Sequence, residues 1–329
     1  MIRILLPHPG IYNDIVIPLR DLHGAEVDTV SDKSAAGFTN KSAIVKSLLD
    51  RKVLTLARSW TRDDAVLVIG WHILPVLLLI KLGLVAAPRK LISLGCFVHS
   101  ITLRRTFNVL VRLLKMRRLY FVTFSQSELE NLAKHAGIPR ENLYPHLWRQ
   151  DLWGAVAKDE VSEGDYIFSG GYSNRDYSML IEVLRGMPYK SVLVASKLNQ
   201  LSPDVPPTMK LMLDTDEHTF EKYLAGSRLV VIPLKSAGDA CGQSVLLRVL
   251  RNEKPLIITR QQAVEEYLGS DYPGYVPAND PEALEESIKR AYEDNAYRQL
   301  LAAAIARRNQ KMSALGAPHE EFHRYLTTP

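Results

Sequence analysis

The sequence predicts an α/β protein of two consecutive doubly wound domains, and three observations support this prediction. The chain has 329 residues, about twice the usual domain size, so two separate cores are expected. Short apolar runs alternate with longer helical patterns from the first residue, which is typical of βαβ units and parallel sheets. Residues 145–164 interrupt this alternation, because proline, glycine, tryptophan and mixed charges follow one another there without a sustained period.

The interruption sets the predicted domain boundary. We expect one Rossmann-like domain over residues 1–150, a second over 151–311, and a C-terminal helix or tail over 312–329 that packs back on the first. Doubly wound domains bind ligands at the carboxyl ends of their strands, so the function should be sought there.

Each element is predicted from its hydrophobic period. In the first domain we expect strands at 2–6, 26–30, 65–70, 90–95 and 119–124, and helices at 43–57, 72–84, 101–116 and 126–136. In the second we expect strands at 165–169, 190–195, 209–213, 228–232 and 255–258, and helices at 175–186, 217–225, 243–252, 262–268, 281–293 and 295–311.

The composition indicates a packed globular protein, with 47% hydrophobic and 23% charged residues. Cys96 and Cys241 lie far apart, without a CxxC pair or a histidine at metal spacing, so we expect reduced, buried thiols in a cytoplasmic protein. The first apolar run is too short for a signal peptide. The stretch 71–87 falls short of the ~20 residues that cross a bilayer, so a buried helix is expected there.

Positive charge is concentrated in residues 101–118, where six arginines and lysines alternate with apolar residues. Two interpretations stay open. Such a helix can lie peripherally on the anionic inner face of the cell membrane, or it can pack on the core with a basic outer face. Nucleic acid is not expected as a partner, because the cluster has few aromatic residues and no known binding motif surrounds it.

The first chemical motif follows the predicted strand of the second domain. Gly170 and Gly171 lead into a polar loop that opens a helix, so backbone N–H groups can converge there on a phosphate. Arg175 can add a charge-assisted contact to the same anion. Two alternatives stay open: the glycines form a plain tight turn, and Asp176 caps the helix itself.

The second motif follows the strand at 228–232. A loop of small residues leads into a helix at about Gln243, whose N-terminus can receive a phosphate. Two anion-accepting helix starts in one domain suit a diphosphate better than a carboxylate. The acidic pair Asp214 and Asp216 more simply lines a turn near a nucleotide base than binds a metal, and no divalent-metal cluster of carboxylates is evident.

These segments together resemble the GT-B glycosyltransferases, in particular the family-4-like bacterial group. The resemblance covers most of residues 165–310 and rests on FSGGYSNRDYSML, YLAGSRLVVIPL, GQSVLLRVLRNEKPLIIT and YVPANDPEALEESI. It implies two Rossmann-like domains that face a central cleft. It also implies a hexosyltransferase that moves a sugar from a UDP- or GDP-sugar to a hydroxyl acceptor.

The resemblance implies a set of donor-binding residues. The positions of Lys197 and Asp214 just after predicted strands add these two residues to the set. The set comprises Gly170, Gly171, Ser173, Arg175, Lys197, Asp214, Cys241, Gly242, Gln243 and Ser244. Asp239 and Ala240 would face the donor sugar, with Asp239 in a catalytic place. Many relatives carry a second glutamate, which holds the nucleotide ribose, with seven residues between it and the first; here Leu247 or Arg248 stands there, depending on a one-residue shift of the alignment. Retention of configuration is therefore not implied, and Arg248 is either an anion contact or a solvated helix residue.

In the first domain the resemblance is fainter and rests on LISLGCFVHSITLRR and VTFSQSELENL. His99, at a strand end, is the first candidate for a base that deprotonates the acceptor hydroxyl, and Asp14, in the loop after the first strand, is the second. His8 and Gly10 are weaker candidates on the acceptor side.

The sequence therefore predicts metal-independent glycosyl transfer without a cofactor. A glycan or a lipid-linked glycan is the expected acceptor, in bacterial polysaccharide or glycolipid biosynthesis. Two alternatives remain: a nucleotide-sugar epimerase of the same fold, and a noncatalytic module that binds nucleotides or carbohydrates.

Overall fold

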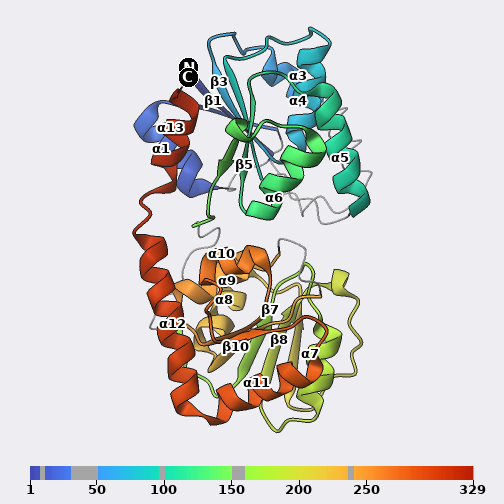
Figure 1. Ribbon diagram of the computed structural model, residues 1–329, viewed down its shortest axis with the longest axis vertical. Coiled ribbons are helices and arrows are strands. Elements are labelled where there is room, and N and C mark those ends of the chain that lie inside the picture. The colour runs from blue at the N-terminus through green and yellow to red at the C-terminus, as the bar shows by residue number, and fades with distance from the viewer. Residues whose placement is uncertain (8–11, 31–50, 96–100, 150–159, 236–240, 329) are drawn as a thin grey trace. The chain divides into compact units, whose positions relative to one another are not determined.

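The computed structural model describes residues 1–7, 12–30, 51–95, 101–149, 160–235 and 241–328. The chain divides into two compact units. Unit 1 comprises Met1–Gln150 with Gly316–Pro329, and unit 2 comprises Asp151–Leu315. Each unit is built around one six-stranded sheet (Figure 1).

The sheet of unit 1 is parallel throughout, with the strand order β2-β1-β3-β4-β5-β6. Its strands are β1 (Ile2–Leu6), β2 (Glu26–Thr29), β3 (Ala65–Ile69), β4 (Lys90–Leu94), β5 (Leu119–Thr123) and β6 (Leu143–Pro145). Every residue of β3 and β4 is buried, as expected for central strands that are covered on both faces. The strand order reverses between β1 and β3, which is where such a sheet opens a crevice at its carboxyl edge.

The helices of unit 1 are α1 (Asn13–His23), α3 (Arg51–Ala57), α4 (Ile73–Lys81), α5 (Ile101–Leu114), α6 (Gln126–Asn131) and α13 (Pro318–Thr327). The last of them returns from the end of the chain and packs on α1 (Figure 1). The contact includes His23 and His323, whose rings stack 3.8 Å apart. The chain end is thus part of the structure of unit 1.

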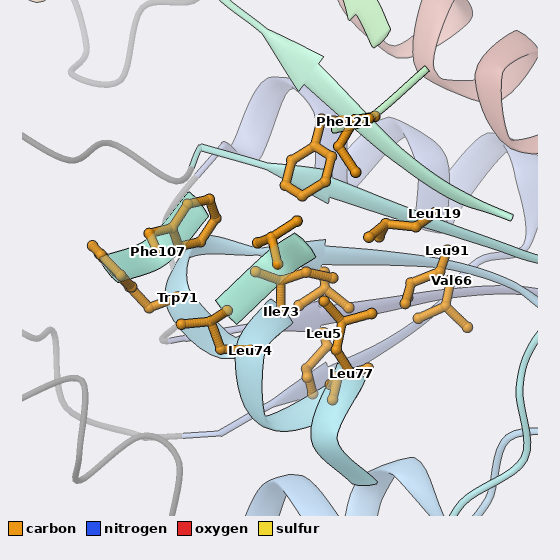
Figure 2. Packing of buried hydrophobic residues seen from close by; sticks show 14 of the residues in the cluster. Leu5, Val66, Trp71, Ile73, Leu74, Leu77, Leu91, Phe107, Leu119 and Phe121 are labelled. Carbon is orange, nitrogen blue, oxygen red and sulfur yellow. The ribbon is translucent and has the colours of Figure 1, made fainter. Parts of the chain in front are cut away.

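A hydrophobic cluster lies between the sheet of unit 1 and the helices α3 to α6 (Figure 2). Trp71 meets Phe107 of α5 edge-on at 5.4 Å, and Phe107 in turn meets Phe121 of β5. Five consecutive residues, Ile73 to Leu77, are buried at the start of α4, so the apolar stretch 71–87 forms a core helix. No helix in the part of the chain described here is both long and apolar enough to cross a membrane.

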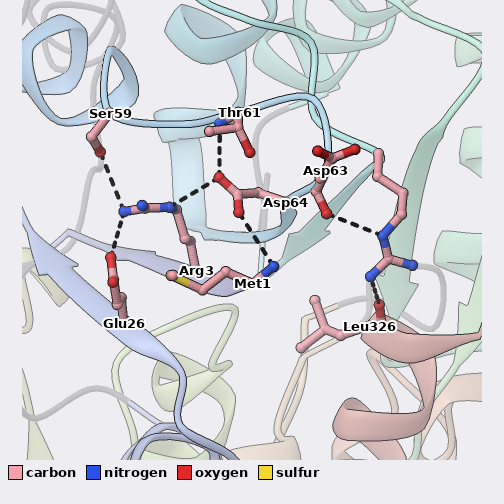
Figure 3. A network of polar contacts seen from close by, with 9 residues as sticks. Met1, Arg3, Glu26, Ser59, Thr61, Asp63, Asp64 and Leu326 are labelled. Carbon is pink, nitrogen blue, oxygen red and sulfur yellow. Dashed lines mark hydrogen bonds and ion pairs between the residues drawn. The ribbon is translucent and has the colours of Figure 1, made fainter.

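The amino edge of this sheet is closed by a polar network (Figure 3). Asp64, which is 3% exposed, accepts a bond from the Thr61 amide at 2.7 Å and from Arg3 Nε at 3.1 Å. Arg3 also pairs with Glu26 at 2.6 Å. Burial alone would raise the pKa of Asp64, but the hydrogen bonds from Thr61 and Arg3 outweigh it and lower that pKa.

The sheet of unit 2 is also parallel, in the order β12-β11-β10-β7-β8-β9. Its strands are β7 (Ile167–Gly170), β8 (Ser191–Ala195), β9 (Met209–Leu213), β10 (Leu229–Ile232), β11 (Leu256–Thr259) and β12 (Tyr275–Val276). This is the Rossmann order, in which the first and fourth strands are neighbours. The switch point therefore lies between β7 and β10, the two strands that precede the predicted phosphate loops.

The helices of unit 2 are α7 (Tyr177–Arg185), α8 (Glu217–Gly226), α9 (Gln243–Arg251), α10 (Gln262–Leu268), α11 (Pro281–Glu293) and α12 (Asn295–Ser313). All six were predicted from their period, as were the strands except β12. Among the α-helices and strands of the described chain, three were missed: α1, which contains Pro18, and the short strands β6 and β12. Proline disfavours a helix in sequence reasoning, although a proline in the second turn is tolerated here.

Candidate functional site

The loops that follow β7 and β10 meet at the switch point of unit 2. The amide of Asp176 donates to Pro233 O at 3.0 Å, and the amide of Lys235 donates to Asn174 O at 3.2 Å. Arg175 and Leu234 form an antiparallel bridge between these bonds. The two sequence motifs are thus joined into one rim, which we call the switch-point rim (residues 170–176, 233–235 and 241–244).

Two glycines shape the first loop of the rim. Gly171 has φ +116°, a conformation that residues with side chains rarely adopt. A Cβ on Gly171 would lie 2.5 Å from Arg175 Nη2, and one on Gly170 would lie 2.6 Å from the ring of Phe220. Both positions therefore require glycine, which is a stronger constraint than a plain tight turn imposes.

Arg175 supports this loop from within. Its side chain is 4% exposed, Nε donates to Gly170 O at 3.2 Å, and Nη1 donates to Ser173 O at 2.7 Å. Tyr177 adds a bond from its hydroxyl to Gly171 O at 2.6 Å. Burial lowers the pKa of Arg175 below its ordinary value. A positive charge thus lies directly beneath the loop, with two of its donors occupied by backbone carbonyls.

The helix starts of unit 2 fall into two groups. Asp176 caps α7 by accepting from the Met179 amide at 3.2 Å, and Asp216 caps α8 by accepting from the Thr219 amide at 2.9 Å. Helix α9 instead has Gly242 at its N-cap, with φ +96° and no side chain to cap the helix. The capping role considered for Asp176 is confirmed, so α9 is the helix of the rim whose first amides are available to an anion.

Three buried polar atoms around the rim have no hydrogen-bond partner within the described chain. They are Ser169 Oγ at the end of β7, Asn174 Nδ2 in the loop, and Gln243 Nε2 in the first turn of α9. Ser169 is 2% exposed and Gln243 is 4% exposed. A buried polar group without a partner costs free energy, so these three atoms are candidate contacts for a polar ligand or an ordered water at the rim.

The remaining donor-side candidates lie around this rim. Lys197 is 76% exposed and pairs with Asp214 at 3.6 Å, while Asp214 accepts from Ser196 Oγ at 2.9 Å, which lowers its pKa. Asp214 thus lies in a turn and Asp216 caps α8, while their place near a nucleotide base stays a prediction. Cys241 is buried and within electrostatic reach of Arg175. Ser244 is half-buried in the first turn of α9.

The interpretation of Arg248 as a solvated helix residue is wrong, because the side chain is buried. Its side chain is 4% exposed and forms ion pairs with Glu217 and Glu221 of α8. It also stacks over the ring of Phe220 at 4.5 Å. Sequence reasoning did not single out Glu217, because a glutamate in the first turn of a helix is an ordinary capping residue.

Among the unit 1 candidates, Asp14 is half-buried in the first turn of α1 rather than in a loop. Burial raises the pKa of its carboxyl to about 6, although backbone hydrogen bonds oppose this shift. His8, Gly10, His99, Asp239 and Ala240 lie outside the described residues. No group of three or more potential metal-ligating side chains occurs within the described ranges.

No family model and no curated protein matches the chain. Solved structures do match it over its full length. A UDP-forming α,α-trehalose-phosphate synthase from Burkholderia vietnamiensis superimposes with a TM-score of 0.70 at 12% identity, covering 100% of both chains. Anabaena Alr3699/HepE, solved in complex with UDP, gives 0.68 at 15% identity and the same coverage. A glycosyltransferase from Rickettsia africae ESF-5 gives 0.64 at 11% identity, covering 99% of this chain and 98% of the other.

These similarities show the fold. The chain has the GT-B fold, with two α/β units whose parallel sheets each have six strands. At identities of 11–15% they carry no residue roles, so activity and ligands are argued from the site itself.

Proposed function

We propose that this protein is a glycosyltransferase that takes a sugar from a nucleotide-diphosphate sugar bound at the switch-point rim. The observation that carries the proposal is the combination of the uncapped start of α9 with the unpartnered Nε2 of Gln243 beside it. A diphosphate oxygen would accept from both. The Alr3699/HepE structures hold UDP and UDP-glucose, which favours a UDP-sugar over a GDP-sugar as the donor.

The rim supplies what the departing diphosphate needs. Negative charge grows on it as the glycosidic bond breaks, and prearranged donors stabilise that charge in the transition state. The amides of the α9 first turn, Gln243 and the buried Arg175 are held in place before the ligand arrives. In this mechanism Gly170, Gly171 and Ser173 let the diphosphate approach closely, and Lys197 and Asp214 lie toward the nucleoside.

Unit 1 would supply the acceptor side of the reaction. Asp14 is the described residue that suits a general base, because a carboxyl with a pKa of about 6 is ionised at neutral pH yet accepts a proton readily. His99 and Asp239 keep their proposed catalytic roles. The proposed acceptor is the hydroxyl of a glycan or of a lipid-linked glycan in bacterial polysaccharide or glycolipid synthesis.

A membrane-bound acceptor fits the outer face of α5. Phe107 and Val111 are buried in the core, while Val109 and Leu113 are 55% and 66% exposed. Arg105 and Arg112 are exposed on the same helix, and the exposed Leu82 follows α4, which packs against α5. Apolar side chains between cations match the surface of an anionic membrane. The helix thus combines both roles, with one side in the core and the other proposed to lie on the cytoplasmic face of the membrane.

The activity is tested with UDP-glucose and related UDP-sugars, with and without a panel of glycan and lipid-linked acceptors. We expect acceptor-dependent release of UDP together with a glycosylated product. If the protein forms an epimer of the sugar nucleotide in the absence of acceptor, it is an epimerase and the proposed transfer is wrong. Binding of UDP without hydrolysis or transfer from any donor would leave a noncatalytic binding module.

The membrane contact is tested by co-sedimentation with vesicles of neutral lipid, with and without anionic lipid. The protein should sediment with the anionic vesicles, and Leu113→Ser should reduce that fraction. Leu300→Ser, which changes a leucine that is 48% exposed in α12, serves as the matched control. Equal recovery with both vesicle types would remove the membrane from the proposal.

A further inference from the structure

A polar cavity that the proposed mechanism does not use lies at the amino edge of the unit 2 sheet. Its volume is about 510 Å³, within the range of roughly 300–1,000 Å³ for small-molecule pockets. It is formed by the segment before β7, the start of β10, the turn between α9 and β11, and the first turns of α12. The charged residues that line it are Glu163, Asp165, Arg228, Glu253, Lys254 and Arg298.

Helix α9 separates this cavity from the switch-point rim. Its first turn, at Gln243, belongs to the rim, whereas the turn that follows its last residue, Arg251, lines the cavity. At 1.5 Å per residue, the nine residues of α9 place roughly 13 Å between the two. The turn is fixed by Asn252, whose Nδ2 donates to Glu221 at 2.7 Å and to Arg248 O at 2.9 Å. The cavity is thus a separate and well-defined place in unit 2.

The positive charge of Arg228 in the cavity wall is already matched within the protein. Its Nη1 pairs with Asp165 at 2.9 Å, and its Nη2 donates to Tyr292 O at 3.0 Å. The guanidinium also lies over the ring of Tyr292 at 4.7 Å. Arg228 therefore has a fixed position and a carboxylate partner.

The other two cations of the wall form no ion pair within the described chain. Arg298 is half-buried, and its Nη1 donates to Ala291 O at 3.2 Å and to Tyr292 O at 2.9 Å. Its Nη2 donates to Asn295 Oδ1 at 2.6 Å. These partners are neutral, and they leave two of the five N–H donors of a guanidinium for a ligand. Lys254 is also half-buried, and its Nζ has no hydrogen bond in the part of the chain that the structure describes.

Burial makes these two positive charges costly. It lowers the pKa of Lys254, and the nearby charge of Glu163 opposes this shift only in part. Burial also lowers the pKa of Arg298, and the charge of Arg228 lowers it further. The carboxylates of Glu163 and Glu253 line the same cavity, but both residues are exposed and keep their hydration. The charges that have lost water without gaining an ion pair are therefore the two cations.

Two unpaired cations match an anion of two charges. A phosphate monoester carries about −1.5 to −2 charges at neutral pH and presents three oxygens that accept hydrogen bonds. A carboxylate carries one charge, so it would leave one cation unmatched. We propose that Lys254 and Arg298 bind the phosphate of a small phosphate monoester, and that the remainder of the cavity holds its polar body. This inference does not depend on a nucleotide at the rim.

The test follows the acetylation of individual lysines of the full chain by acetic anhydride, measured by peptide mass spectrometry. Glycerol 3-phosphate, a phosphate monoester, should slow acetylation of Lys254 about fivefold, because the bound anion covers Nζ and keeps it protonated. Acetate at the same ionic strength should slow it less than about twofold, because a single charge binds more weakly. Lys289, an exposed lysine of α11, is the internal control and should react at the same rate in every sample.

A variant measures the contribution of the lysine charge. Lys254→Met keeps a long, unbranched side chain without the charge and should weaken glycerol 3-phosphate about tenfold in titration calorimetry, the size expected for a hydrogen bond to a charged group. Lys289→Met is the matched control and should leave this affinity unchanged.

Three results would overturn the inference. The first is equal acetylation of Lys254 with glycerol 3-phosphate and with acetate, and the second is an unchanged affinity in Lys254→Met. The third is slower acetylation of Lys197 without any change at Lys254, which would place the anion at the rim. Protection of Lys254 by inorganic phosphate but not by glycerol 3-phosphate would overturn the assignment to an ester.

Discussion

Buried polar groups at the amino edge of the unit 1 sheet differ from those at the carboxyl edge of the unit 2 sheet in whether they have hydrogen-bond partners. At the amino edge, the buried carboxylate of Asp64 has partners in Arg3 and Thr61 (Figure 3). At the carboxyl edge, Ser169, Asn174 and Gln243 bury polar atoms without partners in the described chain. The difference indicates that the first set stabilises the fold, whereas the second is held for a ligand.

The largest effect on stability is expected from Asp64→Ala, at the amino edge of the unit 1 sheet, where the buried carboxylate has hydrogen-bond partners. This change removes the Asp64 ion pair of Arg3, which keeps Glu26, and leaves the amide of Thr61 without its acceptor, so it should lower the free energy of unfolding by about 3 kcal/mol. Chemical denaturation followed by circular dichroism measures it. Asp63→Ala, at the exposed neighbouring position, is the control and should change stability by less than about 0.5 kcal/mol. Equal effects of the two variants would show that the network contributes nothing specific.

Gly171→Ala should have the next largest effect. The left-handed backbone at this position and the close approach of Arg175 predict a loss of about 1–3 kcal/mol of stability. The loop would also be displaced, so UDP binding should weaken in parallel. Gly316→Ala is the control, because Gly316 is a surface glycine of similar φ (+80°) with open space around it. It introduces backbone strain without displacing the rim loop. It should lose stability but keep the affinity for UDP.

Gln243→Leu sharpens the comparison most clearly. It removes a buried amide nitrogen that has no partner in the described chain, so stability should be unchanged or slightly higher, while UDP binding should weaken about tenfold. Thermal unfolding and calorimetry on the same sample measure both quantities. Gln310→Leu, at an exposed position in α12, should change neither. A loss of stability without any loss of UDP affinity would show that Gln243 stabilises the fold and does not bind the ligand.

The pH dependence of glycosyl transfer tests the proposed role of Asp14 in unit 1. If Asp14 is the base, its carboxyl must be ionised, and its pKa of about 6 places the loss of activity below pH 6. The ratio kcat/KM should therefore fall about tenfold per pH unit below this value and stay level above it. Asp14→Asn should lower the rate and abolish this limb of the profile. A wild-type profile that is level down to pH 5 would exclude Asp14 as the base.

The smallest effect is expected from metal removal. Helix amides and basic side chains carry the proposed charge stabilisation, so treatment with EDTA should leave UDP release unchanged. Restoration of lost activity by added Mg²⁺ would mean that a metal ion shares this role.

The fold could be predicted from the sequence because its periods are local. The apolar run of β3 and the amphipathic helices α9 and α11 are legible without any tertiary contact. Helix α1 was missed, since Pro18 masks its period, and β12 was missed because two residues carry no pattern.

The loops of the candidate site were found by their glycines, but the roles of neighbouring side chains were not. Whether Arg175 faces outward or supports the loop, and whether Arg248 is solvated or buried, depends on residues far away in sequence, such as Phe220 and Glu217. Burial of a charged side chain is a tertiary property, so no local pattern reveals it.

The central claim is that a nucleotide diphosphate binds at the switch-point rim, and amide hydrogen exchange with and without UDP tests it most directly. Saturating UDP should slow exchange at residues 170–175 and in the first turn of α9, from Gln243 to Leu246. The capped start of α11 near Ala283 should exchange at the same rate in both samples. Protection elsewhere, or no protection in either rim segment, would contradict the account.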